Sequence, residues 1–128
     1  MKPRLVIADD EADICRLITF LLRSYDLAEA RNGKRALELI REVPPDLVLL
    51  DVMMPEMTGL EVLDAVRRNP LTAAIPIILL SAKGQAAEIE RGLQSGATRY
   101  LVKPFEPLAL RTCVAEVLEE YHRQPAKE

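Results

Sequence analysis

Five polar residues lie at the ends of short apolar runs of the 128-residue sequence: Asp9, Asp10, Asp51, Ser81 and Lys103. Taken singly, each has an ordinary explanation, because Asp caps helices, Ser begins turns and Lys is solvated. Brought together, three carboxylates repel one another unless a cation or a proton lies between them. Mg²⁺ takes oxygen ligands, keeps several waters and leaves positions for phosphoryl oxygens. The set therefore indicates phosphate chemistry at a magnesium site.

Asp51 is the candidate nucleophile of this set. Once a metal neutralises the surrounding charge, a carboxylate can attack phosphorus and form an acyl phosphate. Lys103 and the Ser81 hydroxyl would then donate to the transferred oxygens, since proteins assist such transfers mainly through position and charge. This chemistry requires residues that are far apart in the sequence to meet in space.

Five alternations of an apolar run with a segment of helical period predict the fold that would bring these residues together. The runs have the length of strands and lie at 4–8, 27–30, 47–50, 75–80 and 99–102. The alternation predicts an α/β fold, a doubly wound (βα)5 domain whose five-stranded parallel sheet has helices on both faces. Ligands of such sheets bind at the carboxyl ends of the strands. The five polar residues are expected at that edge.

The helical segments differ in the width of their apolar stripes. After the first strand, apolar residues recur at helical spacing and mark one face: Ile14, Leu17, Ile18, Leu21 and Leu22. The fourth segment, around Ile89 and Leu93, has the thinnest stripe. We expect it to be the least firmly packed helix and the easiest to move.

Composition and charge exclude several classes of function. The net charge is only −3 and the basic residues are scattered, so we expect no direct nucleic-acid binding by this chain. No apolar run is long enough to span a membrane and the start does not resemble a secretory signal, which predicts a cytoplasmic location. Cys15 and Cys113 lack CxxC spacing and clustered histidines, so we expect buried reduced thiols and no zinc site.

Four motifs in register carry a family resemblance: "VIADDE" at 6–11, "DLVLLDVMMPEMTGLEVL" at 46–63, "PIILLSA" at 76–82 and "GATRYLVKPF" at 96–105. Over roughly residues 4–121 the chain resembles a response-regulator receiver domain of two-component signalling, of the chemotaxis-regulator type. The resemblance implies a flavodoxin-like strand order of 2-1-3-4-5. We expect a receiver domain over residues 1–122, followed by a polar tail or the start of a linker at 123–128.

The resemblance also implies a role for each site residue. Asp51 would be the phosphoacceptor, and Mg²⁺ would be held by Asp9, Asp10, Asp51 and the backbone carbonyl of Met53. Ser81 and Lys103 would contact the phosphoryl group, and the Lys103–Pro104 bond would be cis. Tyr100 stands at the position of the switch aromatic and would turn inward when Ser81 moves toward the phosphate. The alternative for Tyr100 is a half-buried strand aromatic that never moves.

The implied function is a phosphorylation-gated switch rather than an enzyme. A histidine kinase or phosphotransfer protein would supply the phosphoryl group, and the surface of the fourth helix, fifth strand and fifth helix would act on an output domain or protein. The chain is not expected to be its own kinase, because it has no GxxxxGK[ST] loop and its single histidine, His122, is expected at the surface. A homodimer through the same surface would follow the family, but Thr98 and Arg99 depart from the acidic pattern found there in many relatives.

Two positions that tune dephosphorylation in the family correspond to Met53 and Lys83. A methionine side chain cannot orient a hydrolytic water by hydrogen bonding, so we expect a persistent phosphorylated state.

Two other functions fit the sequence less well. A haloacid-dehalogenase-type phosphatase also uses an Asp nucleophile and Mg²⁺ but needs a second Asp two residues later, where this chain has Met53. A degenerate receiver that binds proteins without phosphorylation is disfavoured by the complete acidic set.

Overall fold

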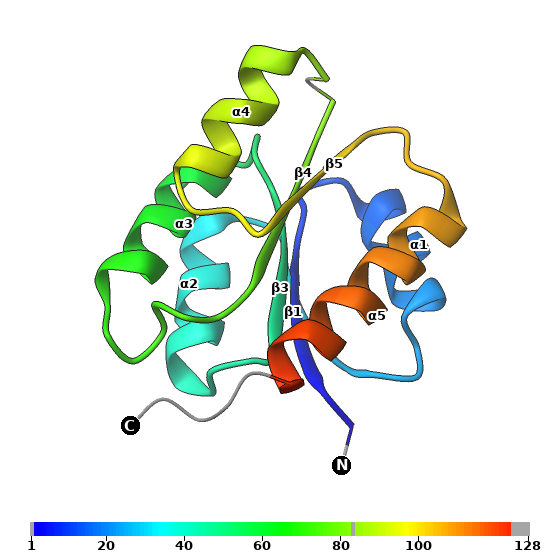
Figure 1. Cartoon of the computed structure of the whole chain (residues 1–128), viewed down its shortest axis with the longest axis horizontal. Helices are drawn as coiled ribbons and strands as arrows, with labels where there is room; N and C mark the ends of the chain where they lie inside the picture. The colour runs from blue at the N-terminus through cyan, green and yellow to red at the C-terminus, as the bar shows by residue number, and fades with distance from the viewer. Residues whose placement is uncertain (1, 83, 124–128) are drawn as a thin grey trace.

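Five parallel strands form one sheet in the order β2-β1-β3-β4-β5, as predicted (Figure 1). The structure is a computed structural model that describes residues 2–82 and 84–123, with side chains described up to Tyr121. The strands are β1 (Arg4–Ala8), β2 (Asp26–Ala30), β3 (Leu47–Asp51), β4 (Ile77–Ser81) and β5 (Arg99–Val102). The helices are α1 (Ala12–Leu21), α2 (Gly33–Glu42), α3 (Gly59–Arg68), α4 (Ala86–Gln94) and α5 (Pro107–Arg123).

Helices cover both faces of the sheet, with α2, α3 and α4 on one side and α1 and α5 on the other (Figure 1). Alternate side chains of each strand point to opposite faces, so β1 sends Val6 into one hydrophobic core and Leu5 and Ile7 into the other. The first core lies under α2 and α3, and the second lies under α1 and α5. The sheet is therefore the middle layer of three, and its central strands are shielded from water on both faces.

The central strands agree with the sequence prediction. All residues of β3 and β4 are buried, as are Leu5–Ala8 of β1. β4 begins at Ile77 rather than 75, because Pro76 has no N–H to donate and contributes only its carbonyl, which accepts from Val48 N at 3.0 Å. Asp51 and Ser81 are the last residues of their strands, so the sheet itself fixes their backbone.

Two details of the predicted packing were wrong. Leu17 of α1 is 38% exposed, although it was expected on the same apolar face as the buried Ile18. Cys113 is only partly buried at the edge of the packed face of α5, whereas Cys15 is buried as expected. Burial raises the pKa of Cys15 to about 11, and its thiol donates to the carbonyl of Asp9 at 3.2 Å.

α4 is the least firmly packed helix, in agreement with its thin apolar stripe. Gly92 is the one buried residue among those of α4, and Leu93 is 42% exposed. By contrast, α3 buries Gly59, Val62, Leu63 and Val66. Arg123 closes α5, so most of the predicted tail, residues 124–128, lies outside the described part of the chain, as does Lys83.

None of the helices within the described ranges combines the length and apolar character that a membrane crossing needs.

Candidate functional site

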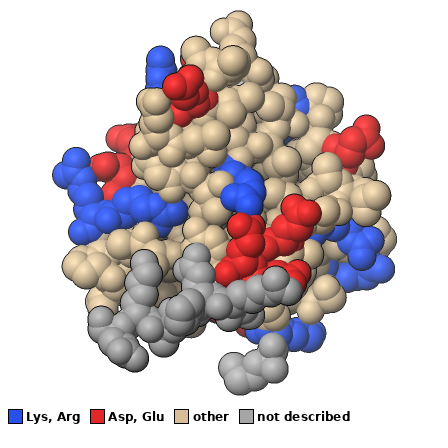
Figure 2. Space-filling model, in the orientation of Figure 1, with Lys and Arg blue, Asp and Glu red and all other residues tan. Residues whose placement is uncertain are grey.

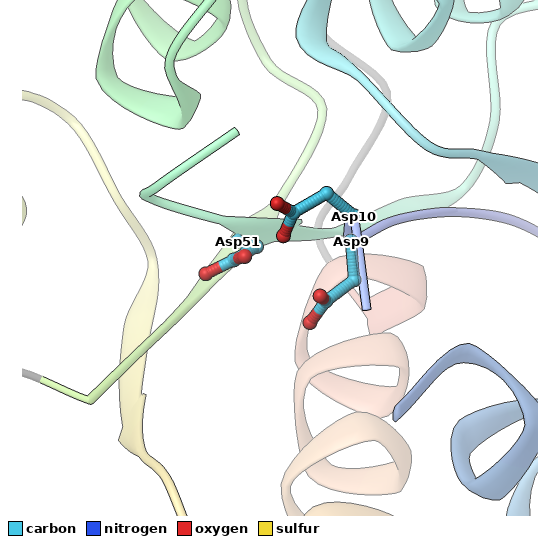
Figure 3. A group of neighbouring side chains, drawn as sticks. All are labelled: Asp9, Asp10 and Asp51. Atoms are coloured by element: carbon cyan, nitrogen blue, oxygen red, sulfur yellow. The ribbon is translucent and has the colours of Figure 1, made fainter. Parts of the chain in front are cut away.

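Three carboxylates meet where β1 and β3 end. Ala8 of β1 pairs with Leu50 of β3, so Asp9 and Asp51 emerge side by side from neighbouring strands. Asp9, Asp10 and Asp51 each place a carboxylate oxygen within 4.8 Å of the others (Figure 3). The convergence predicted from the strand ends is therefore present in the structure.

The three acids differ in burial. Asp9 is fully buried and Asp51 is 4% exposed, whereas Asp10 is exposed to solvent. Asp9 Oδ1 accepts a hydrogen bond from Glu11 N at 2.9 Å, and the Asp51 carboxylate accepts one from the N–H of Met53. Burying two carboxylates side by side is costly unless cations compensate them.

Lys103 supplies a compensating cation from the end of β5. Its Nζ lies 2.8 Å from Asp9 Oδ2 and 3.4 Å from Asp51 Oδ1, and its side chain is only 11% exposed. The Lys103 N–H donates to the Ser81 carbonyl at 2.8 Å, which ties the lysine backbone to the end of β4. The ammonium is thus held between the two buried acids by the sheet itself.

The charges at this site shift the pKa values of Asp51 and Lys103. Burial and the nearby Asp9 raise the pKa of Asp51 from 3.8 to about 6, although Lys103 and the Met53 N–H oppose the rise. Burial lowers the pKa of Lys103, but its close contact with the Asp9 carboxylate and the charge of Asp51 outweigh this and raise it. Lys103 is therefore cationic at neutral pH, and Asp51 is mostly ionised there.

The group retains acceptor capacity for a divalent cation. In the described part of the chain, Asp9 Oδ2 is the buried side-chain oxygen that lacks a hydrogen bond, because its 2.8 Å contact with Lys103 is an ion pair without hydrogen-bond geometry. One ammonium does not neutralise three carboxylates, and all the candidate ligands are oxygens. This donor set fits Mg²⁺, which prefers carboxylate ligands and retains waters.

A pocket of about 310 Å³ opens above the acids. Its walls include most of the predicted site residues and are formed by Asp10, Glu11, Asp51, Met53, Ser81, Ala82 and Lys103. Asp9 lies beneath the pocket rather than on its wall. The Ser81 side chain is almost fully buried at the end of β4. The Met53 side chain is 58% exposed at this opening. The predicted nucleophile, lysine, serine and methionine therefore share one cavity.

Tyr100 lies apart from this cavity, in a second hollow. The side chain is half-buried, and the hollow beside it is lined by residues of the β3–α3 loop, α3 and α4, including Met53, Thr58 and Gly92. A Cβ on Gly92 would lie 3.0 Å from the Tyr100 ring, so the absence of a side chain there leaves room for that ring. Met53 borders both hollows. The Lys103–Pro104 bond is cis, as expected.

The sequence predicts no role in the site for Glu11, and for Gly59 it predicts only a role in shaping the loop and the start of the third helix. Glu11 places Oε1 3.2 Å from Lys103 Nζ. Gly59 packs so closely on β3 that a Cβ would lie 2.2 Å from the Asp51 carbonyl oxygen, while its N–H donates to the Val52 carbonyl at 2.8 Å. Glu11 was visible as the third acid of "DDE" and Gly59 as the glycine that begins a capped helix, but only the structure joins them to Lys103 and Asp51.

Comparison with known proteins gives consistent matches along the chain. The family model of the response regulator receiver domain matches residues 5–115. The DNA-binding response regulator MtrA of Mycolicibacterium paratuberculosis is 37% identical over 129 residues, covering 99% of this chain and 56% of that protein. The phosphate regulon transcriptional regulatory protein PhoB of Pseudomonas aeruginosa is 40% identical, covering 89% of this chain and 51% of that protein. The chain thus spans about half the length of these relatives.

Solved structures similar to this chain are also response regulators. A putative response regulator from Chloroflexus aurantiacus superposes with a TM-score of 0.88 at 34% identity, covering 93% of this chain and 99% of that one. The chemotaxis protein CheY4 of Vibrio cholerae gives a TM-score of 0.85 at 30% identity, covering 91% of this chain and 99% of that one. The chain belongs to the response regulator receiver domain family of two-component signalling.

Proposed function

We propose that Asp51 accepts a phosphoryl group from a partner histidine kinase or phosphotransfer protein, and that this modification gates a signalling surface on the domain. The observation that carries the proposal is the position of Asp51. Among Asp9, Asp10 and Asp51, it is the one acid that is both largely buried and exposed to the 310 Å³ pocket, where Lys103 lies 3.4 Å from its carboxylate. Asp9 is sealed beneath the pocket, and Asp10 is exposed to solvent.

The protonation state of Asp51 suits a nucleophile at neutral pH. A pKa of about 6 leaves the carboxylate mostly ionised while making it more basic than an ordinary Asp. In the transfer, an Asp51 oxygen forms a bond to phosphorus, and the bond between phosphorus and the donor atom breaks. The electron pair of that bond leaves with the donor.

The remaining site residues stabilise the transferred group. Lys103 would pair with the phosphoryl oxygens, and the Ser81 hydroxyl would donate to one of them. Asp9, Asp10, Asp51 and the Met53 backbone carbonyl would hold Mg²⁺. When bound, the ion neutralises negative charge on the phosphoryl oxygens and on the acids that face them.

The surface that responds would comprise α4, β5 and α5. Drawing Ser81 and Lys103 toward a phosphoryl group acts directly on the ends of β4 and β5, and Tyr100 and the thinly packed α4 lie beside them. Near-complete switching between two conformations requires a difference of about 5.5 kcal/mol in how the two states bind the modification. The output domain or protein would recognise this surface.

A homodimer through the same surface would have to accommodate charges that are already paired. Arg99 contacts Glu120 of its own chain at 2.5 Å, close to Glu116 and Glu119. Figure 2 shows acidic and basic side chains lying next to one another on this side of the molecule. Dimerisation there would exchange the Arg99–Glu120 pair for contacts between chains.

The lifetime of the phosphorylated state would depend on Met53. Its exposed thioether lies at the mouth of the pocket and cannot position a water for attack on phosphorus. We expect Met53→Asn to shorten the half-life of the phosphorylated domain, as measured by loss of the label after removal of the donor. An unchanged half-life would overturn this part of the proposal.

Incubation with Mg²⁺ and acetyl phosphate tests the phosphoacceptor role. Intact-mass spectrometry should detect one added phosphoryl group that is absent without Mg²⁺ and absent in Asp51→Asn. Asp64→Asn is the matched control, because Asp64 is an exposed acid of α3, outside the pocket, that pairs with Arg68. Modification of the Asp51→Asn protein to the wild-type level would refute the proposal.

A further inference from the structure

Glu11 is a third acidic partner of Lys103. Its Oε1 lies 3.2 Å from Nζ and accepts a hydrogen bond from it. Glu11 occupies the N-cap position of α1, yet within the described residues its side chain makes no capping hydrogen bond to that helix. Its backbone N–H is held by Asp9 Oδ1 at 2.9 Å. The backbone is therefore fixed by the site, while the carboxylate is directed at the lysine.

The three acidic partners of Lys103 differ in their freedom to leave it. The side chains of Asp9 and Asp51 are 0% and 5% exposed, whereas that of Glu11 is 61% exposed. An exposed carboxylate exchanges an ion pair for water at little cost, but a buried one leaves an uncompensated charge behind. Of these partners, Glu11 is the one that can release the ammonium cheaply.

We infer that Glu11 is a positioning residue that holds Lys103 in the unphosphorylated domain and competes with the incoming phosphoryl group for its ammonium. The inference deepens the proposed function and rests on it, since Lys103 must turn toward the phosphoryl oxygens. Glu11 also lines the pocket through which a donor reaches Asp51, so its charge opposes the approach of an anionic donor. Both effects slow phosphorylation.

Glu11→Gln tests the inference, because it keeps the shape of the side chain and removes the charge. We expect the second-order rate constant for phosphorylation by acetyl phosphate to rise about two- to fivefold at low salt, the range of an exposed ion pair. The gain should shrink as added salt screens the charge. Asp13→Asn is the control, because Asp13 is an exposed acid in the first turn of α1 that pairs with Arg16, and its rate constant should not change.

A second variant and a second measurement distinguish the contact between Glu11 and Lys103 from a general effect of negative charge at the pocket. Glu11→Asp keeps the charge but shortens the reach to Lys103. Its rate constant for phosphorylation should therefore lie between those of the wild type and Glu11→Gln. In the unphosphorylated protein, ¹³C relaxation should show faster motion at Lys103 Cε in Glu11→Gln than in the wild type. This measurement does not depend on phosphoryl transfer, so it remains informative if the proposed function fails.

Different results would overturn the role of Glu11 and the proposed function. Unchanged or slower phosphorylation of Glu11→Gln, an equal gain in Asp13→Asn, or unaltered motion of Lys103 would each overturn the role of Glu11. A wild-type domain that takes no phosphoryl group on Asp51 would instead overturn the proposed function.

Discussion

The centre of the sheet is more deeply buried than its β5 edge. β3 and β4 are buried along their whole length and support Asp51 and Ser81 at their ends. At the edge, β5 is half-buried, and α4 beside it buries only Gly92 among its described residues. A reacting carboxylate must hold its position, whereas a signalling surface must change. The difference in packing places low local stability where movement would be useful.

Truncation of a buried side chain should give the largest difference in stability between the centre of the sheet and its edge. Leu50 of β3 is fully buried beside Asp51, so Leu50→Ala removes apolar contacts and leaves a cavity. We expect a loss of about 2–5 kcal/mol in the free energy of unfolding, measured by urea denaturation. Leu93→Ala on α4 is the matched control and should stay within about 0.5 kcal/mol of the wild type, because Leu93 is 42% exposed. Equal losses in the two variants would contradict the comparison.

Replacing a glycine by alanine should also affect the centre of the sheet more than its edge. A Cβ at Gly59 would lie 2.2 Å from the backbone oxygen of Asp51, which cannot move without disturbing the site. We expect Gly59→Ala to cost about 1–3 kcal/mol of stability and to slow phosphorylation.

The corresponding substitution at the edge is Gly92→Ala. The atoms nearest to its Cβ would belong to the side chains of Leu79 and Tyr100, at 3.0 Å, and alanine favours the helix by about 1 kcal/mol. Its net effect on unfolding should therefore be smaller than that of Gly59→Ala. A larger loss of stability in Gly92→Ala would show that the edge is packed as tightly as the centre.

The buried charge at the centre should make stability depend on pH. The pKa of Asp51 is raised from 3.8 to about 6, so the folded protein binds the proton more tightly than the unfolded chain does. Folding is therefore penalised progressively as pH rises from about 4 to 6, and the penalty is complete above that range. We expect Asp51→Asn to be more stable than the wild type at pH 7 by about 1–2 kcal/mol, because asparagine, like the protonated carboxyl, brings no negative charge beside the buried Asp9.

Urea denaturation at pH 7 and at pH 4 measures this effect. Most of the advantage of Asp51→Asn should be lost at the lower pH, where the wild-type carboxyl is protonated in the folded state and about half protonated in the unfolded chain. An advantage that persists at pH 4 would mean that repulsion at the acidic cluster is not its origin.

Mg²⁺ should relieve part of the same repulsion. At ten times its dissociation constant, an ion that binds only the folded state stabilises it by about 1.4 kcal/mol. Thermal unfolding of the wild type should shift upward with Mg²⁺, and that of Asp9→Asn and Asp51→Asn should shift less. An equal shift in Asp51→Asn would place the ion elsewhere.

The sequence predicted the centre of the molecule better than its edges, for physical reasons. Strands buried on both faces are nearly continuous apolar runs, and parallel strands end at one edge, so the meeting of Asp9 and Asp51 follows from their order in the chain. Contacts that depend on how a long side chain extends do not follow from such patterns. The ion pair between Glu11 and Lys103 belongs to this class.

Arg67 is a second example of what the sequence does not reveal. Its guanidinium donates to the backbone carbonyls of Ala73, Ile75 and Gly96 at 2.7–3.0 Å, and so joins the end of α3 to the segments before β4 and β5. In the sequence it is one of two adjacent arginines in the last turn of a helix, a position at which arginine is usually solvated. Only the packed structure distinguishes Arg67 from Arg68.

The central claim is that the buried Asp51 itself carries the phosphoryl group. After reaction with acetyl phosphate and Mg²⁺, borohydride reduction converts an aspartyl phosphate to homoserine, which peptide mass spectrometry can locate. The account predicts homoserine at residue 51 and at no other acid of the cluster. Homoserine at residue 9 or 10, or none at residue 51 in a domain that has gained a phosphoryl group, would contradict it.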